Sequence, residues 1–237
     1  MTTIINIERG TFGGPLRMGD LVGVCNVVEH LRRINNKTNI QFYIKNEAIS
    51  PEKYVQDFYS FLLEITNYFS KFEGQNSLPW QRVNLWDFRD ISGDLLKIPN
   101  NKPMQKKIVI IPLFDAPYNV YRNWPKELLQ QLVQKYSNEE YSNYSKIICS
   151  RDPNCQYEQW TTSTDIIDNL NHIMDAEIFI GGDTGTSHFA WSLDRSPQDM
   201  IYYNSSRGLI HTLPFYLMQG KGKMFTYWMD FEGTKWQ

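Results

Sequence analysis

The chain has 237 residues and is 41% hydrophobic, 14% aromatic and 21% charged, which excludes a disordered protein and allows one large or two small domains. A net charge of −2 excludes a uniformly basic surface, so nucleic acid could be contacted only through a local groove. The cysteines, Cys25, Cys149 and Cys155, have no metal-ligand spacing and favour a reducing compartment. No segment has the features of a signal peptide or a membrane span, so we expect a soluble cytoplasmic protein.

The N-terminal part of the chain predicts a strand–helix–strand unit. The isoleucine-rich segment 4–8 (IINIE) indicates a strand, and from Asp20 to Ile34 apolar residues recur at three- and four-residue steps, as in an amphipathic helix. A second strand is expected at 40–44 and a second helix at 54–72. Two strands joined by a helical crossover form the basic element of a parallel sheet.

The segment 97–107, which contains two prolines and two asparagines, is the best candidate for a linker. After it the alternation restarts, with strands expected at 107–112, 146–150, 177–181 and 200–203 and helices at 125–136, 164–174 and 186–193. The predicted fold class is therefore α/β, with two small domains joined near residue 100 and a cleft between them.

The stretch at 181–190 (GGDTGTSHFA) has the features of an anion-binding loop. A short apolar strand ends at two glycines, and a polar loop leads into the first turn of a helix. Backbone N–H groups and the positive end of a helix dipole would converge there, which favours a diphosphate. The alternative is a tight strand-to-helix turn with an Asp cap. The candidate binding residues are Gly182, Asp183, Thr184, Gly185, Thr186, Ser187 and His188.

Three separate segments, in the same order, resemble the heptosyltransferase-like glycosyltransferases of family 9, which have the GT-B architecture. The turn at 16–22 (LRMGDLV) is similar to the family's Leu-Gly-Asp turn after the first strand. The segment at 122–128 (RNWPKEL) is similar to its basic-x-Trp-Pro segment, and the loop at 181–190 to its Asp-Thr-Gly-Pro-x-His-Leu-Ala signature. This chain is shorter than usual for the family, has a longer first loop, and has Arg122 where lysine is common and Thr186 where proline is common.

The resemblance implies two Rossmann-like domains facing a cleft, an acceptor-side domain at 1–104 and a nucleotide-sugar-binding domain at 105–237. It implies an enzyme that moves a sugar from a nucleoside-diphosphate sugar to an acceptor hydroxyl with inversion. Asp20 would be the general base, with Gly19 and Arg17 on the acceptor side, while Arg122 and the loop at 182–188 would hold the diphosphate. No metal or cofactor is expected beyond the nucleotide-sugar co-substrate.

Several of these site residues could have a purely structural role. Asp20 could cap the helix that follows it, Arg122 could be a solvated residue before a helix, and His188 could be a buried structural histidine. Asp183 is expected to brace its loop, because a carboxylate beside a diphosphate is repulsive. The aromatic run at 224–231 would cross back to the first domain, as in GT-B enzymes, or would complete the core of the second.

The sequence allows more than one acceptor and more than one reaction class. A glycan or lipopolysaccharide-type sugar is the usual acceptor in the family. The chain is rich in Asn, Lys, Ile and Tyr, which is typical of AT-rich bacteria and phages, and phage GT-B enzymes also modify hydroxymethylated DNA bases in the host cytoplasm. The same kind of cleft would also suit a sugar-nucleotide epimerase or hydrolase, for which Asp152 and Glu158 could be the acid/base carboxylates, or a non-catalytic nucleotide-binding protein.

Overall fold

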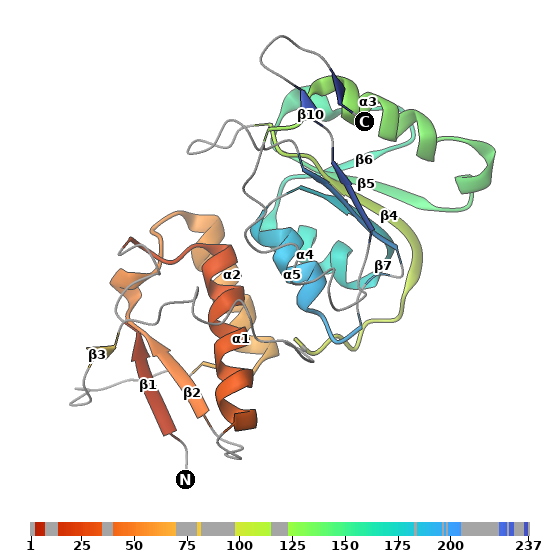
Figure 1. The fold of residues 1–237 in the computed structure, drawn as a ribbon. Coiled ribbons are helices and arrows are strands. Elements are labelled where there is room, and N and C mark those ends of the chain that lie inside the picture. The colour runs from red at the N-terminus through yellow and green to blue at the C-terminus, as the bar shows by residue number, and fades with distance from the viewer. Residues whose placement is uncertain are drawn as a thin grey trace. The chain divides into compact units, whose positions relative to one another are not determined.

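The computed structural model describes residues 3–7, 14–34, 40–69, 80–81, 98–114, 123–182, 184–195, 197, 199–204, 223–226, 228–229 and 235–236. The chain divides into two compact units (Figure 1). Unit 1 comprises Met1–Pro99 and Ser192–Asp194, and unit 2 comprises Asn100–Trp191 and Arg195–Gln237. The first passage from one unit to the other therefore falls inside the segment that the sequence indicated as a linker.

Unit 1 contains a three-stranded parallel sheet with the order β2-β1-β3. Its elements are β1 (Thr3–Ile7), α1 (Met18–Ile34), β2 (Ile40–Ile44), the 3₁₀ helix η1 (Asn46–Ala48), α2 (Lys53–Ile65) and β3 (Trp80–Gln81). The expected strand–helix–strand unit is confirmed by the parallel pairing of β1 with β2. Its core contains the apolar stripes of the two helices, with Val24 and Val28 of α1 and Phe58 and Leu62 of α2 fully buried.

Helix α2 is shorter than predicted. It ends before Thr66, which takes an extended conformation and donates its hydroxyl to the Leu62 carbonyl at 2.7 Å. The apolar pattern nevertheless continues, since Tyr68 and Phe69 are buried and the Phe42 amide donates to the Tyr68 carbonyl at 2.8 Å. Apolar residues that prolonged the helical period in the sequence thus pack beside β2 outside the helix.

Unit 2 contains a six-stranded sheet in which all neighbouring strands are parallel, with the order β6-β5-β4-β7-β8-β9. Its strands are β4 (Gln105–Ile111), β5 (Ser145–Cys149), β6 (Thr161–Ser163), β7 (Ala176–Gly181), β8 (Asp199–Asn204) and β9 (Lys223–Thr226). Its helices are α3 (Lys126–Tyr136), α4 (Ile166–Asp175) and α5 (Gly185–Ser192), with 3₁₀ turns η4 (Glu139–Tyr141) and η5 (Pro153–Cys155). A short antiparallel pair, β10 (Trp228–Met229) and β11 (Lys235–Trp236), follows.

The strand order explains how unit 2 is wound. The chain begins in the middle of the sheet with β4, builds one half outward through β5 and β6, and returns to β7 to build the other half. This order is compatible with a Rossmann-like sheet. The α/β class expected from the sequence is therefore confirmed for this unit.

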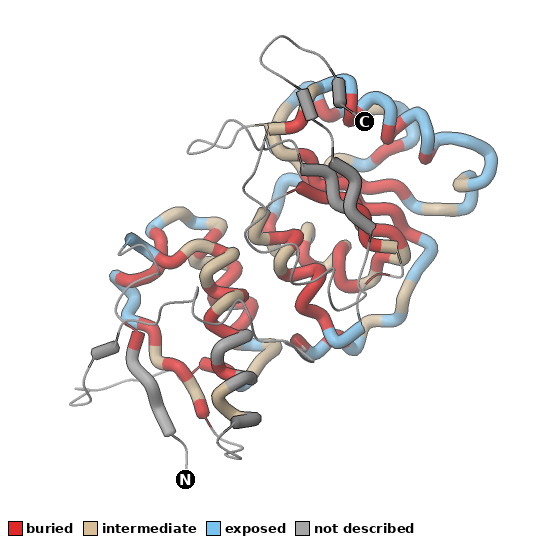
Figure 2. Tube along the Cα trace, viewed as in Figure 1, coloured by how far each residue is buried: buried red, intermediate tan, exposed pale blue. Residues whose placement is uncertain are grey.

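Helices cover both faces of the unit 2 sheet. Helix α3 packs on one face, where its leucines form one cluster with isoleucines of β4 and β7, including Ile110 and Ile180. Helices α4 and α5 lie on the opposite face (Figure 1). Strands β4, β5 and β7 are accordingly buried over most of their length, whereas the outer side of α3 is exposed (Figure 2). Strands covered on both faces appear in the sequence as continuous apolar runs, which is why β4 and β7 could be predicted.

Part of the C-terminal aromatic run belongs to unit 2. Residues 224–226 lie in β9, which pairs with β8 at the edge of the six-stranded sheet. Of the two alternatives for this run, its position agrees with a place in the second domain and not with a crossing to the first, because β9 is hydrogen-bonded to β8. Tyr227, Asp230 and Phe231 of the run lie outside the described residues.

The three cysteines are buried and unpaired. Burial raises the pKa of the Cys25 thiol and raises that of Cys149 to about 12. A thiol needs its thiolate form to react or to bind a metal, so these cysteines serve as small apolar core residues.

Candidate functional site

Asp20 lies in the first turn of α1 in unit 1. The helix begins at Met18, with Arg17 before it, so Asp20 is the third helical residue and not the residue that precedes the helix. Its Oδ2 accepts the backbone N–H of Arg17 at 2.9 Å. An acidic side chain at this position that reaches back to the start of the helix is one half of a capping box. The expected capping role is therefore correct in kind, but its geometry differs from a simple N-cap.

The backbone before this turn is fixed by the segment around η1. The Leu16 amide donates to the Ala48 carbonyl at 2.7 Å, and the Ser50 amide donates to the Leu16 carbonyl at 2.9 Å. Leu16 itself is buried, whereas Arg17, Gly19 and Asp20 are only half-buried. The predicted acceptor-side residues thus sit together on an anchored turn, with the Asp20 carboxylate oriented by a backbone N–H.

The predicted anion loop lies at the start of α5 in unit 2. Thr184 caps this helix, because its Oγ1 accepts the Ser187 N–H at 3.2 Å. The same hydroxyl lies 2.8 Å from the Thr186 hydroxyl and 3.1 Å from the Ser187 hydroxyl. We call Thr184, Thr186 and Ser187 the hydroxyl cluster. The structure therefore brings these three candidates together, with His188 one residue further on, where its amide donates to the Thr184 carbonyl at 3.1 Å.

The hydroxyl cluster retains donor capacity. Its members contain three hydroxyl protons, one per residue, and the two hydroxyl–hydroxyl contacts use one proton each. One proton therefore remains for another acceptor. Ser187 is 2% exposed and Thr186 is 8% exposed, so the protein already holds these side chains in place. A cluster held in this way is pre-organised to donate to an anion at the helix N-terminus.

Gly181, the last residue of β7, is required by close packing under this loop. A Cβ at this position would lie 2.5 Å from the Ser187 Oγ and 2.8 Å from the Phe179 ring. The Phe179 side chain is fully buried, so a shift of its ring would disturb its packed neighbours. Sequence reasoning placed Gly181 in the strand but assigned it no role, since a close approach between strand and helix depends on tertiary packing.

We expect Gly181→Ala to reduce the free energy of unfolding by about 1–3 kcal/mol, the usual cost of overpacking a tight core. Chemical denaturation measures this change. Gly14→Ala is the control, because Gly14 is exposed and a Cβ there meets nothing within 4 Å. An unchanged stability for Gly181→Ala would mean that the β7–α5 junction is looser than the structure indicates.

The topology gives this loop a special position. The centre of the sheet is the point where the chain reverses its direction of strand addition, between β4 and β7. Ile111, the last residue of β4, pairs with Gly181, so the carboxyl ends of both strands lie side by side. Open parallel α/β sheets bind ligands outside the carboxyl ends of the strands at such a switch point. The hydroxyl cluster begins at Thr184, in the loop that follows one of these two strand ends.

The start of α3 is hydrogen-bonded to the segment that follows β4, the second of these two strands. The Trp124 amide donates to the Leu113 carbonyl at 2.6 Å, and Leu113 is the second residue after β4. The sequence predicted Pro125 as the first residue of this helix, but in the structure Pro125 precedes it. Arg122 and Asp183, two of the predicted site residues, lie outside the described residues.

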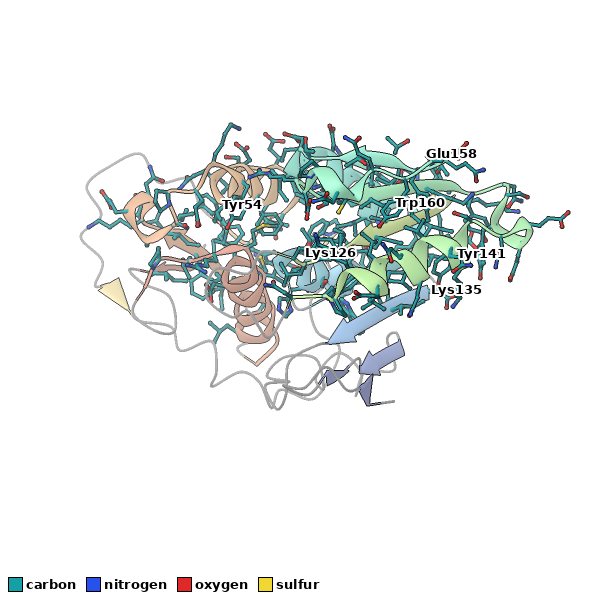
Figure 3. The ribbon with its side chains drawn as sticks, turned by 90° about the horizontal axis from the view of Figure 1, so that it is seen from above. Tyr54, Lys126, Lys135, Tyr141, Glu158 and Trp160 are labelled. Carbon is teal, nitrogen blue, oxygen red and sulfur yellow. The ribbon has the colours of Figure 1, made fainter. Side chains whose placement is uncertain are left out.

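Lys126 is a candidate that sequence reasoning did not single out. It is the first residue of α3, and Figure 3 shows it at the opposite end of this helix from Lys135. Its charge reaches the loop after β5, where it helps to lower the pKa of Asp152. A cation in the first turn of a helix is disfavoured by the helix dipole. A lysine at this unfavourable position is the sequence signal that could have identified Lys126 as a candidate for binding an anion.

Asp152 does not have the features of a general acid. Its Oδ1 accepts both the backbone N–H and the side-chain NH₂ of Asn154, each at 2.8 Å. These hydrogen bonds, from the backbone first, lower the pKa of the carboxyl. It caps η5 in its ionised form. In the epimerase or hydrolase hypothesis, Asp152 could therefore serve as the base but not as the acid.

Among the described residues, no three or more His, Cys, Asp or Glu side chains are grouped so that they could hold a metal ion. Within the same ranges, every helix is too short or too polar to pass through a lipid bilayer. Comparisons with protein-family models, with curated proteins and with solved structures found no match to this chain.

Proposed function

We propose that this protein is a glycosyltransferase that moves a sugar from a nucleoside-diphosphate sugar to an acceptor hydroxyl with inversion. In this proposal the two units are the two Rossmann-like domains of a GT-B arrangement and face a common cleft. Unit 2 binds the donor, and unit 1 supplies the acceptor side through Arg17, Gly19 and Asp20. No metal takes part, and the nucleotide sugar is the only co-substrate.

The observation that supports this proposal best is the position of the hydroxyl cluster. It combines a helix N-terminus, buried hydroxyl groups and the switch point of a parallel sheet. A diphosphate suits such a place because backbone N–H groups and hydroxyls can both donate to its oxygens. Arg122, which precedes α3 in the sequence, would add a permanently charged, forked donor.

The chemical step is a single displacement at the anomeric carbon. The acceptor oxygen attacks this carbon, its proton passes to the Asp20 carboxylate, and the bond to the departing diphosphate breaks. Negative charge that develops on the diphosphate is taken up at the start of α5. The hydrogen bond from the Arg17 N–H to Asp20 Oδ2 orients the carboxylate for proton transfer.

The acceptor class follows from the family resemblance and is a glycan or lipopolysaccharide-type sugar. The second possible acceptor is a hydroxymethylated DNA base, as for a phage enzyme. A thermal-shift screen of nucleotide sugars, followed by acceptor screening with the donor that binds, tests both.

We expect Thr184→Ala and Arg122→Ala each to weaken nucleoside-diphosphate binding by about 1–3 kcal/mol, the range for hydrogen bonds to a charged group. Isothermal titration calorimetry measures the effect. Thr184→Ser retains the hydroxyl and should bind normally, and Lys135→Ala removes a cation at the far end of α3 and should have no effect. Normal affinity in both test variants would place the donor site elsewhere.

A nucleotide-binding protein without catalysis is the second candidate. This candidate is favoured by the structural role of Asp20. Its carboxylate accepts a backbone N–H at the start of α1, which accounts for an aspartate there without catalysis. The two functions differ in one measurable property. Slow hydrolysis of the bound donor in the absence of an acceptor, lost on Asp20→Asn, supports the transferase, whereas binding without any turnover supports the second candidate.

A further inference from the structure

Helix α5 connects the candidate anion site to the segment that passes between the units. The chain changes unit after Pro99, after Trp191 and after Asp194. The first seven residues of α5 belong to unit 2, and its last residue, Ser192, belongs to unit 1. A continuous helix therefore spans the second passage, whereas the sequence had indicated only a polar linker near residue 100.

Within unit 1, the segment at the end of α5 is fixed to Ile98, the residue before Pro99. The Ile98 amide donates to the Ser192 carbonyl at 2.8 Å, and the Asp194 amide donates to the Ile98 carbonyl at 2.9 Å. Ile98 and Leu193 form a parallel bridge, and both side chains are fully buried. We call this pairing the Ile98–Leu193 bridge.

Within unit 2, Asn100 connects the two places where the chain enters this unit from unit 1, at Asn100 itself and at Arg195. Its Nδ2 donates to the Met174 carbonyl at 2.7 Å and to the Arg195 carbonyl at 2.8 Å, and its Oδ1 accepts the Lys102 N–H at 3.1 Å. The side chain is 5% exposed, so these bonds are shielded from water. The chain is thus anchored on both sides of every passage, and little slack remains between α5 and the bridge.

The helix itself is a rigid element. Its eight residues span about 12 Å, at 1.5 Å per residue. Phe189, Ala190 and Trp191 are at most 2% exposed, so its body is held in the packed core. A shift at either end is therefore transmitted to the other end, because bending would break helical hydrogen bonds.

We infer that α5 couples occupancy of the hydroxyl cluster to the Ile98–Leu193 bridge, and through it to the connection between the units. An anion that orders the start of the helix stabilises the bridge, and loosening the bridge weakens anion binding by the same factor. That the anion is a diphosphate rests on the proposed function. The coupling between the two ends of α5 does not depend on it.

Hydrogen exchange of the Ile98 and Asp194 amides in the full chain tests the coupling without any ligand. Thr184→Ala, which removes the cap at the far end of α5, should speed their exchange about fivefold or more, the lower limit of typical coupling between sites. Thr162→Ala is the matched control, because it removes a threonine hydroxyl that is also hydrogen-bonded within unit 2, there as a donor to the Cys155 carbonyl, but lies outside α5. If Thr184→Ala fails to fold, Ser187→Ala takes its place. Unchanged exchange in the α5 variant, or an equal change in the control, overturns the inference.

A second experiment uses wild-type protein with inorganic pyrophosphate and with ADP, GDP, UDP and CDP. Binding by calorimetry together with slower exchange of the Ile98 and Asp194 amides supports the coupling. Binding with unchanged exchange overturns it. Absence of binding by all five compounds contradicts the proposed donor site, while the variants above still decide whether α5 couples its two ends.

Discussion

Replacement of Asp20 by Asn is expected to leave the fold intact and to reduce sugar transfer by about 10²–10⁴-fold, the usual contribution of a positioned general base. Asn has nearly the size of Asp, and its Oδ1 can still accept the Arg17 N–H that Asp20 now binds at 2.9 Å. The start of α1 should therefore keep its cap while the proton acceptor is lost. Initial rates at saturating donor, the melting temperature and donor affinity by calorimetry separate these effects.

Asp57→Asn is the matched control for this variant. Asp57 is also a helical aspartate of unit 1, but it pairs with Lys53 on the surface of α2 and has no place in the proposed site. Its transfer rate should equal that of the wild type. Transfer at the normal rate by Asp20→Asn would remove this carboxylate from the mechanism, and loss of folding would show that its capping role dominates.

The sequence was a good guide where one local pattern determines the structure. Strands β4 and β7 are continuous apolar runs because helices cover both of their faces, and their positions were predicted within one or two residues. Strand β6 was missed, since Thr161–Ser163 is a short polar segment at the sheet edge. Such a segment becomes a strand only because β5 is there to pair with it.

The candidate site shows the same division. The polar loop after β7 could be placed from its glycines and hydroxyl residues, and the structure locates it at the switch point of the sheet. The hydroxyl contacts of Thr184 and the close approach at Gly181 depend on how α5 packs, which no local pattern encodes. Asn100 is the clearest case, since its two carbonyl partners are 74 and 95 residues away in the chain.

The buried ion pair at the opposite end of β4 leads to the largest expected change in stability. Lys107 Nζ lies 2.5 Å from Asp175 Oδ1, and the two side chains are only 9% and 13% exposed. A further neighbour of this ammonium group is His172, whose Nδ1 lies 3.5 Å away. Burial and the Lys107 charge lower the pKa of His172, so this imidazole is neutral and cannot replace the carboxylate. We expect Asp175→Ala to reduce the free energy of unfolding by about 3–5 kcal/mol, because it leaves a buried cation unpaired.

Two further variants separate the cost of leaving Lys107 buried and unpaired from the loss of the attraction between the two charges. Asp57→Ala breaks the Lys53–Asp57 pair, which also has an N–O distance of 2.5 Å but whose side chains are 85% and 30% exposed. Its stability should change by less than about 0.5 kcal/mol, because water solvates the remaining lysine. Replacing both buried partners, as in Lys107→Met with Asp175→Leu, should restore most of the stability, since no buried charge remains. Denaturant unfolding, with amide exchange in β4 as a local measure, compares the three proteins. Equal losses for the buried and the exposed pair would mean that the ammonium group of Lys107 reaches water once Asp175 is removed, and burial would then not explain the pairing.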